Sequence, residues 1–196
     1  MADTGPVTEL VEMSLLVPLE DFLPTFTTTF LPVLLAAPGI LSVRTGPKYS
    51  GPHCEVDDRT GISITQWSSL QAHEDFLNGL SADAFFKGLG DWMSGPPTVG
   101  HFMLGSLRGY EGSAWISMAT GGVGDSDSDR ISQDGTEAVL AGRSVEDEGV
   151  KMHLSVHATE EAMRTAVRSA HSIGKAFGFR VQSFESPPGQ PLRGKL

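Results

Sequence analysis

Hydrophobic residues in the first half of the chain recur at two spacings, every second residue and every third or fourth residue. Val11, Met13 and Leu15 share one side of the segment 7–17, which predicts a strand with one dry face. Similar patterns predict strands over 40–44, 62–67 and 98–104, a helical segment over 19–37 broken by Pro24 and Pro32, and a helix that starts after Ser69. The Gly- and Pro-rich stretch 46–60 predicts an exposed loop. The resulting order, β-α-β-β-α-β, is the ferredoxin-like arrangement.

The second half repeats part of this plan. Alternation predicts strands over 114–120, 137–143, 150–157 and 179–184, and a helical pattern predicts a helix over 158–177 that Thr159 caps and Gly178 ends. Residues 121–135, where the first half has its first helix, are mostly glycine, serine and aspartate and predict a loop. The second half therefore resembles a degenerate copy of the first that has lost one helix.

Two such copies can complete one another. The sequences that follow Trp67 and His157 are weakly alike, since each enters a helix through a hydroxyl residue. Two four-stranded sheets with helices on one face can bury their other faces together as a closed barrel, and the space between them is a natural ligand cavity. We expect an α+β fold of two ferredoxin-like repeats that form a pseudo-dimeric α/β barrel. Residues 7–107 would be the first repeat, 113–186 the second, and 187–196 a flexible tail.

Composition excludes several classes of partner. The 196 residues carry 14 Lys and Arg against 24 Asp and Glu, a net charge of −10, so nucleic acid and anionic membranes are poor partners. Cys54 is the single cysteine, so the chain has no intrachain disulfide and no cysteine zinc cluster. No signal-peptide pattern and no apolar run of about 18 residues is found. We expect a soluble, cytoplasmic protein.

One local motif carries a resemblance to a known family. An Ile-rich strand ends in Trp67 and is followed by Ser-Ser-Leu-Gln-Ala-His73 and Phe76 at the start of a helix. With the element order, this motif resembles the dimeric α/β-barrel superfamily, in particular its antibiotic-biosynthesis-monooxygenase (ABM-like) branch. Members of that family usually pair two chains to make the barrel. The resemblance therefore implies that this chain is a monomeric pseudo-dimer, or a homodimer of such units.

The family resemblance also implies small-molecule chemistry. Members oxygenate polyketide-like phenols without metal or flavin, cyclise polyketides, cleave haem or isomerise lactones. Haem-cleaving members combine an Asn on the first strand with a His ten residues after the Trp, whereas this chain has no such Asn and has Leu77 at that place. Cyclase members use a His and a Tyr, for which His73, His101 and Tyr49 are available.

Strand alternation predicts which polar side chains share a face. Polar rows occur on three of the predicted strands: Glu12 and Ser14; Ser63, Thr65 and Trp67; and His153, Ser155 and His157. In a closed barrel we expect these rows to face the interior and the aliphatic rows to pack against helices. They would then place hydroxyls, a carboxylate and imidazoles around one pocket, where imidazole can transfer protons near neutral pH.

The candidate residues fall into two groups. The candidate acid–base residues are His73, His101, His153, His157 and Glu12, and the candidate substrate-contacting residues are Trp67, Trp115, Tyr49, Ser14 and Thr65. Each has a structural alternative, such as a core position for Trp67, a buried hydrogen-bonding role for His101, or solvent exposure for His153 and His157. These last two lie about 13 Å apart at ~3.3 Å per residue, too far to bind one metal ion. We expect no metal and no cofactor.

Two loop patterns lack the residues that define the motifs they resemble. The glycines of 121–124 are not followed by the Lys-Ser/Thr pair of a phosphate loop. The aspartates of 125–129 open like a calcium loop, but Arg130 stands in the place of its glycine and Thr136 in the place of its bidentate Glu. An acidic, solvated loop is the expected structure.

The hypothesis that follows is a cofactor-independent tailoring enzyme of secondary metabolism. It would act on a polyketide-like or aromatic molecule, by cyclisation, dehydration or isomerisation with histidine as acid and base. The alternatives are a cofactor-free ABM-type monooxygenase and a non-catalytic module for binding small molecules or responding to stress. Fold alone does not separate these classes.

Overall fold

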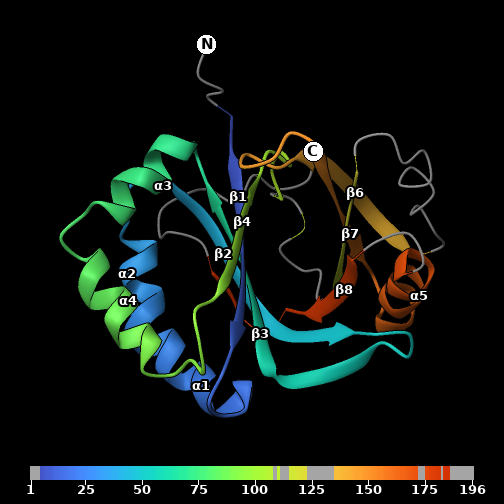
Figure 1. The fold of residues 1–196 in the computed structure, drawn as a ribbon, viewed down its shortest axis with the longest axis horizontal. Helices are drawn as coiled ribbons and strands as arrows, with labels where there is room; N and C mark the ends of the chain where they lie inside the picture. Colours follow the sequence, from blue (N-terminus) through green and yellow to red (C-terminus); the bar gives the residue numbers. More distant parts are fainter. Residues whose placement is uncertain are drawn as a thin grey trace.

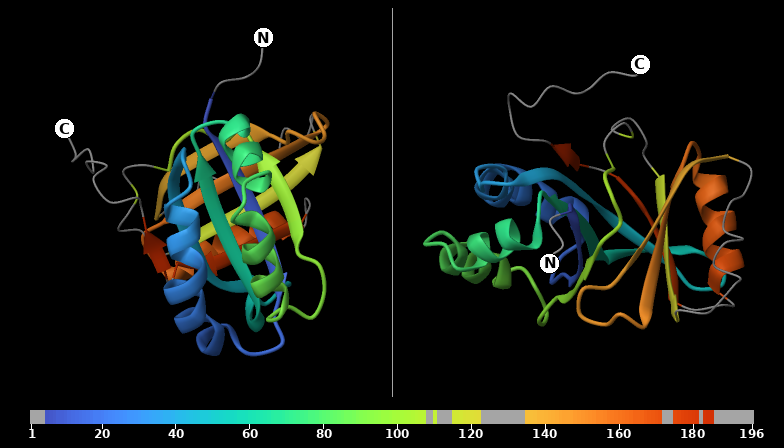
Figure 2. Two further views of the ribbon diagram at one scale, coloured as in Figure 1. Left: turned by 90° about the vertical axis from the view of Figure 1, so that its left-hand side faces the viewer. Right: turned by 90° about the horizontal axis from the view of Figure 1, so that it is seen from above.

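The computed structural model of the chain describes residues 5–107, 110, 115–122, 135–171, 175–181 and 183–185. These residues form a central curved sheet with helices on two opposite outer faces (Figure 1). Helices α1 to α4 lie against one side and α5 lies against the other, as the view from above shows (Figure 2). Among the described helices, none is long and apolar enough to cross a membrane.

The first repeat follows the predicted order of elements. It consists of β1 (Val7–Ser14), α1 (Leu19–Thr25), the π-helical turn η1 (Phe26–Phe30), α2 (Leu31–Leu35), β2 (Ile40–Ser50), β3 (Glu55–Trp67), α3 (Leu70–Leu77), α4 (Ala82–Gly90) and β4 (Thr98–Phe102). The expected break in the first helical segment is present as the π-helical turn between Pro24 and Pro32. The hydroxyl of Thr28 donates a hydrogen bond of 2.8 Å to the carbonyl of Pro24 at this turn.

The prediction of an exposed loop over 46–60 is wrong. Strands β2 and β3 continue through this stretch as a long hairpin, which turns at Gly51 with a φ of 78°. The outer part of β2 pairs with β8 of the second repeat, where Lys48 is opposite Phe179 and Ser50 is opposite Phe177. The backbone hydrogen bonds of this pairing come from a strand more than a hundred residues away in the sequence. The local pattern of Gly and Pro residues therefore could not indicate that this stretch is a strand.

The second repeat consists of β5 (Trp115–Gly122), β6 (Thr136–Arg143), β7 (Val150–His157), α5 (Glu160–His171), β8 (Lys175–Arg180) and β9 (Ser183–Glu185). The prediction that its helix extends to Phe177 and ends at Gly178 is wrong, since β8 begins at Lys175. Gly178 is needed for packing, because a Cβ there would lie 2.1 Å from the sulfur of Met163 on α5. The loop expected over 121–135 falls mostly outside the described residues.

The strands form one sheet in the order β4-β1-β3-β2-β8-β5-β7-β6, with β9 beside β2. Each half has the ferredoxin-like order 4-1-3-2, and β2 joins the halves through β8. The opposite ends of the sheet also meet, since Met103 N–H donates to the carbonyl of Arg143 at 3.0 Å and Val145 N–H donates to that of His101 at 2.8 Å. The expected α+β fold of two ferredoxin-like repeats is therefore confirmed.

The two seams between the repeats are built alike. At one seam a Cβ on Gly46 would lie 1.5 Å from the carbonyl oxygen of Arg180, and at the other a Cβ on Gly142 would lie 2.0 Å from that of Met103. Gly46 pairs with Ile62 of β3, and Gly142 pairs with Met152 at the equivalent register of β7. The same close backbone approach thus requires glycine twice, once in each repeat.

Buried Arg44, Gln66 and Thr8 share the interior side of their strands with Ile64, but the core of the barrel interior is apolar, which corrects the expected polar interior. Its buried residues are Ile62, Ile64, Phe102, Leu104, Leu107, Ile116, Met118, Met152, Leu154, Val156 and Phe179. The polar row of Ser63, Thr65 and Trp67 lies on the outer face of β3, beneath the helices. On β7 the buried row of His153, Ser155 and His157 is likewise the one opposite the barrel interior. Alternation defined the two faces of each strand correctly, and on β1 the aliphatic row of Val11, Met13 and Leu15 packs under the helices as expected, but on β3 and β7 the expected faces are reversed.

The proposed division into domains stays a prediction. Its boundary between 107 and 113 and the tail 187–196 fall largely outside the described residues. Along β6 half-buried residues alternate with exposed ones, and Val139 is one of the exposed residues.

Candidate functional site

Three titratable side chains meet on the outer face of the first repeat's part of the sheet, between the sheet and α3. His73 Nε2 lies 3.4 Å from Glu9 Oε1, and the rings of His73 and His101 are 4.6 Å apart between centroids. One ligand-type atom of each of the three side chains lies within 4.8 Å of the others. We call Glu9, His73 and His101 the acid–base cluster.

The register of the sheet explains why these side chains meet. Glu9 of β1 is opposite Thr65 of β3 on one side and His101 of β4 on the other, so the three side chains share a face. His73 approaches from the first turn of α3, whose N-terminus is capped by Ser69 through a 3.2 Å bond from Ala72 N–H. The cluster therefore depends on strand pairing and on one helix start.

Glu9 is ionised and firmly held. Although burial raises its pKa, the hydrogen bond and charge of His73 and the N–H of Trp67 together lower the pKa of Glu9 below its ordinary value. Trp67 Nε1 donates to Glu9 Oε2 at 3.1 Å, and its ring packs against His73 at 5.2 Å between centroids. Trp67 is completely buried, so in this structure it positions Glu9.

A second carboxylate holds His101. Glu146, in the turn between β6 and β7, lies 2.5 Å from His101 Nδ1 and also accepts the backbone N–H of His101. Burial raises the pKa of Glu146, but the bonds from His101 and Ser144 lower it below its ordinary value overall. With Nδ1 as the donor to Glu146, the neutral form of His101 has its lone pair on Nε2.

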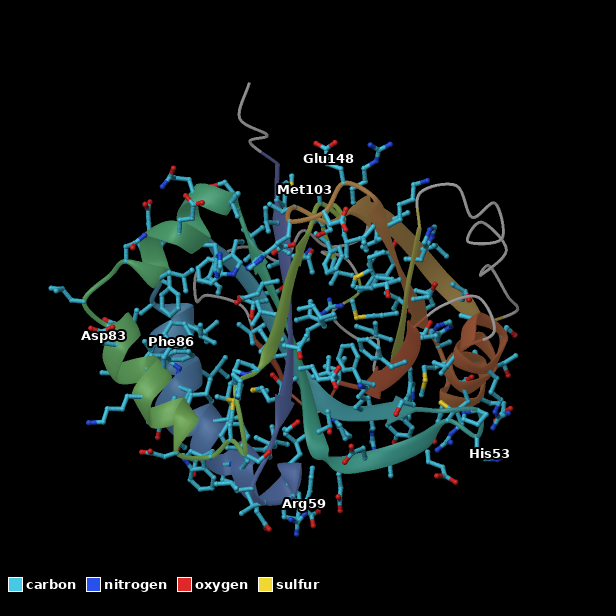
Figure 3. The ribbon with its side chains drawn as sticks, in the orientation of Figure 1. His53, Arg59, Asp83, Phe86, Met103 and Glu148 are labelled. Carbon is cyan, nitrogen blue, oxygen red and sulfur yellow. The ribbon has the colours of Figure 1, made fainter. Side chains whose placement is uncertain are left out.

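An apolar cavity of about 220 Å³ begins at Glu9 and runs beneath the helices. We call it the inner cavity. Its walls are mostly aromatic and aliphatic, with Glu9, Ser63 and Thr65 as polar exceptions; the others include Val11, Met13, Phe26, Phe76, Phe85, Phe86 and Val99. Phe86, on the outer helix α4 (Figure 3), and Val99 are each 45 % exposed although they line it, so they mark its opening to solvent.

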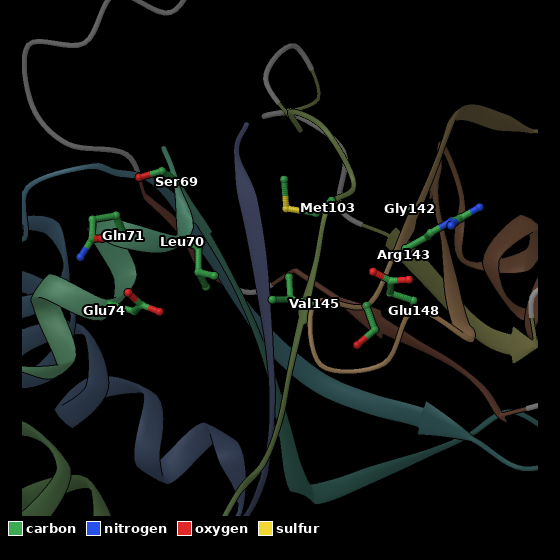
Figure 4. Close-up of a pocket in the computed structure, with 10 residues that line it drawn as sticks. Ser69, Leu70, Gln71, Glu74, Met103, Gly142, Arg143, Val145 and Glu148 are labelled. Atoms are coloured by element: carbon green, nitrogen blue, oxygen red, sulfur yellow. The ribbon is translucent and has the colours of Figure 1, made fainter. Parts of the chain in front are cut away.

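A wider groove lies on the other side of the cluster. It has a volume of about 790 Å³ and runs between the start of α3 and the turn after β6, with Met103 and Val145 between them (Figure 4). Glu74 and Val145, which line this outer groove, directly follow His73 and directly precede Glu146 in the sequence. Within the acid–base cluster Glu9 lines the inner cavity, while the outer groove is lined by sequence neighbours of His73 and Glu146.

The second repeat has no such cluster at the equivalent place. Ser117 of β5 pairs with Ser155 and Gly178 in the way that Glu9 pairs with Thr65 and His101. Met163 stands four residues after the cap Thr159, as His73 stands four residues after Ser69. Serine, methionine and glycine thus replace the acid–base cluster in the second copy.

His157 occupies the position of Trp67 in the second copy. Its Nε2 lies 2.8 Å from Ser117 Oγ, in place of the Trp67 to Glu9 bond. Burial lowers the pKa of His157 from 6.5 to about 4, so the ring is neutral at physiological pH. His153 is also buried beneath α5, four residues earlier on the same face.

The remaining candidate residues lie elsewhere. Glu12 faces the barrel side and pairs with Lys48 at 2.6 Å, beside a pocket of about 440 Å³ at the mouth of the barrel. Tyr49 and Trp115 pack edge to face at 5.8 Å near α5. Ser14 is exposed at the end of β1. Of the ten residues predicted, the structure brings His73, His101, Trp67 and Thr65 together around Glu9.

Glu9 and Glu146 were missed by the sequence analysis. Glu9 shares its side of β1 with the apolar residues Val11 and Met13. A carboxylate within an otherwise apolar row of a strand is unusual, and this feature of the sequence could have indicated a functional residue. Glu146 lies in a turn, and its contact with His101 spans 45 residues, so no local pattern could have indicated it.

The fold and the strand register define a fused, two-copy α/β barrel. No protein-family model and no curated protein sequence matches the chain. Solved structures do match it along nearly the whole length, which confirms the expected resemblance at the level of the fold.

Three of these structures are instructive. A "putative monooxygenase" from Fusobacterium nucleatum is 10 % identical with a TM-score of 0.64, covering 94 % of this chain and 95 % of its own. An "anthrone oxidase-like protein" is 13 % identical with a TM-score of 0.62, covering 98 % of each chain. A "putative monooxygenase" from Lactobacillus acidophilus is 12 % identical with a TM-score of 0.55, covering 93 % of this chain and 96 % of its own.

Proposed function

We propose that the chain is a cofactor-independent enzyme that removes a proton from a small aromatic substrate bound in the inner cavity. The observation that carries this proposal is an ionised carboxylate, Glu9, at the end of an apolar cavity with an imidazole directly behind it. Pockets that combine apolar walls with a few convergent polar groups are typical of small-molecule sites. A cytoplasmic location stays an expectation.

The shape and lining of the inner cavity favour a compact, flat substrate. Its volume of about 220 Å³ lies below the roughly 300–1,000 Å³ of typical ligand sites, so a long flexible chain would not fit. Phe76 and Phe85, whose rings meet edge to face at 5.6 Å, offer aromatic surface for stacking. The hydroxyls of Ser63 and Thr65 can orient a phenol or ketone oxygen.

The proton route follows from the positions of the cluster. Glu9 lines the cavity and accepts the proton from the substrate, and His73, when its ring is neutral with the Nε2 lone pair towards Glu9, receives that proton across the 3.4 Å contact. A carboxylate with a lowered pKa is a weak base by itself. Transfer of the proton onward to a neutral imidazole, which is a stronger base, makes its removal from the substrate more favourable. The substrate anion remains in an apolar cavity, where water does not compete for it.

Oxygenation is the second candidate, and the neighbours described as monooxygenases and as anthrone oxidase-like favour it over cyclisation. In that reaction the methylene carbon of an anthrone-like substrate loses two hydrogens and gains one oxygen atom from O₂. The other oxygen atom leaves as water, so O₂ is the oxidant and the substrate anion is the reductant. Proton removal is the first step of both reactions, and the acid–base cluster serves it in the same way.

Hydrogen exchange without oxygen tests the proposal directly. Anthrone, or the smaller two-ring ketone 2-tetralone, is incubated with the protein in D₂O under argon, and proton NMR follows the acidic C–H signal against a protein-free control. We expect accelerated exchange that falls about 100-fold or more in Glu9→Gln, because general base catalysis contributes about 10²–10⁴. The matched control Glu20→Gln alters an exposed carboxylate on α1 and should exchange at the wild-type rate.

The same samples distinguish the alternatives once air is admitted. Oxygen uptake above the protein-free rate supports the monooxygenase, and exchange without uptake supports an isomerase or cyclase. If the protein binds anthrone and 2-tetralone but catalyses no exchange, the proposal of an enzyme is refuted and the alternative of a non-catalytic binding module remains.

A further inference from the structure

The acid–base cluster also has the composition of a metal site. It presents one carboxylate and two imidazoles, with one ligand-type atom from each within 4.8 Å of the others. Two nitrogens and one oxygen suit borderline divalent ions of the zinc and iron class, while calcium and magnesium prefer oxygen ligands alone. A three-ligand set leaves a coordination position open, as in catalytic zinc sites.

The neighbours of the cluster provide the outer support that metal ligands require. Ligating histidines almost always donate their second ring N–H to a carboxylate, and Glu146 is placed to accept it from His101 Nδ1 at 2.5 Å. The carboxylate of Glu9 is oriented through its other oxygen by Trp67 Nε1 at 3.1 Å. Each of these two ligands therefore has a partner that leaves one donor atom available.

A second observation points to a ligand at this place. His101 Nε2 is buried and has no hydrogen-bond partner within the described parts of the chain. A buried polar atom without a partner carries a desolvation penalty of about 1–3 kcal/mol, which a bound ion would remove. The side chain of His73 is 4 % exposed, so bulk water has little access to that ligand.

We propose that Glu9, His73 and His101 bind one divalent transition-metal ion of the Zn²⁺ class, and that the bound ion inhibits the enzyme. Binding itself does not depend on the proposed function. Inhibition rests on it, because the ion occupies the lone pairs of Glu9 and His73 that would otherwise accept the substrate proton. The site would make activity sensitive to the concentration of available metal.

Metal titration of the chelator-treated full chain tests the binding. Zn²⁺ is measured by competition with a chromophoric chelator, and Co²⁺ is added separately to record the visible absorption bands of a coordinated ion. We expect one ion per chain, loss of the Co²⁺ bands in His73→Gln and His101→Gln, and at least tenfold weaker Zn²⁺ binding in each. Glu146→Gln, which leaves all three ligands in place, should weaken binding about tenfold as outer partners do.

His53→Gln is the matched control, because His53 is exposed at the β2–β3 turn, far from α3 (Figure 3). It should bind Zn²⁺ as the wild type does. Circular dichroism checks that each variant is folded, and Glu146→Gln keeps the test valid if a ligand variant unfolds. Stoichiometric binding that none of these substitutions weakens, or no binding at all, would overturn the site.

Deuterium exchange separates this inference from the proposed function. Exchange by the metal-free protein that Zn²⁺ suppresses supports both. Exchange with no Zn²⁺ binding refutes the metal site alone. Specific Zn²⁺ binding by a protein that catalyses no exchange supports the site and refutes only the inhibition.

Discussion

Glu9 is held by two neighbours that act on it in different ways. His73 contacts one carboxylate oxygen, and Trp67 donates its ring N–H to the other. Trp67 does not line the inner cavity, while Glu9 does. The residue that orients the carboxylate therefore does not itself line the cavity in which the proposed substrate would bind.

Substitution of Trp67 by phenylalanine should separate orientation from binding. Trp67→Phe keeps an aromatic ring against Phe76 but removes the hydrogen bond to Glu9. Because charge-assisted hydrogen bonds contribute about 1.5–3 kcal/mol, we expect kcat to fall roughly tenfold or more while KM stays close to the wild-type value. Steady-state kinetics measure both, and an unchanged kcat would contradict the positioning role.

His157 should make stability depend on pH. Its pKa is about 4 in the folded chain and about 6.5 when unfolded, so the unfolded chain holds more protons between these values. The contribution of His157 to the free energy of unfolding is fully present above about pH 6.5, and it falls by up to about 3 kcal/mol as the pH drops towards 4. Urea unfolding at about pH 5 and about pH 7.5 should show a smaller difference in His157→Gln than in the wild type. Equal differences would show that this imidazole does not titrate as described.

Single residues of the site were partly predictable from the sequence. His73 and His101 were named because imidazole is the natural acid and base near neutral pH. Glu9 was not, because its role arises from opposite neighbours on β3 and β4 that only the register brings together. The three-residue cluster is a property of the sheet rather than of any local motif.

At the scale of elements, α3 and α5 occupy equivalent positions in the two repeats but carry different side chains to the equivalent place. Each starts at a hydroxyl residue whose oxygen accepts the N–H three residues later, Ser69 in α3 and Thr159 in α5. The helix α3 carries His73 into the cluster, and α5 carries Met163 to the same place in its own repeat. Loss of the cap therefore tests both stability and function.

Removal of either cap should destabilise the protein to a similar extent with different effects on catalysis. Ser69→Ala and Thr159→Ala should each lower the free energy of unfolding by about 1 kcal/mol. Only Ser69→Ala should also slow hydrogen exchange into the substrate, because it loosens the first turn that holds His73. Urea unfolding and the exchange assay measure the two effects. Equal losses of activity in both variants would contradict the assignment of one site to the first repeat.

Elements were predicted well where the local periodicity of apolar residues determines the structure. They were predicted poorly where pairing with a strand distant in the sequence determines it. The interrupted helix between Leu19 and Leu35 followed from apolar spacing and two prolines, although its π-helical middle segment did not. The hairpin arm of β2 beyond Gly46 did not, since it is a strand because it pairs with β8. The end of α5 was misplaced because Gly178 resembled a helix stop, although its role is to admit Met163.

At the scale of the whole molecule, the barrel closes through two seams within one chain. Gly46 and Gly142 allow the backbones to approach at these seams. The aliphatic residues inside the barrel come from both repeats, so neither half buries them alone. Stability should therefore depend on both seams together.

A methyl group at either seam glycine should destabilise the whole fold. Gly46→Ala and Gly142→Ala place a Cβ against backbone, which cannot move as a side chain can, so we expect losses of about 3 kcal/mol each. Gly95→Ala is the control, since nothing lies within 4 Å of its added Cβ. Urea unfolding gives all three values, and a mild effect at Gly142 would show that the β4–β6 seam is open in solution.

The closed barrel also predicts a single chain in solution. Since both seams lie within one polypeptide, sedimentation should give a mass near 20.9 kDa at micromolar concentration. A mass of twice this value would show that the unit pairs further through another surface.

Because Ser117, Met163 and Gly178 stand where the other copy has Glu9, His73 and His101, the proposed enzyme would have one reaction centre in each polypeptide, where a symmetric pair would have two. Saturation curves should then be hyperbolic with a Hill coefficient of one, and a tight inhibitor should titrate activity to zero at one equivalent per chain.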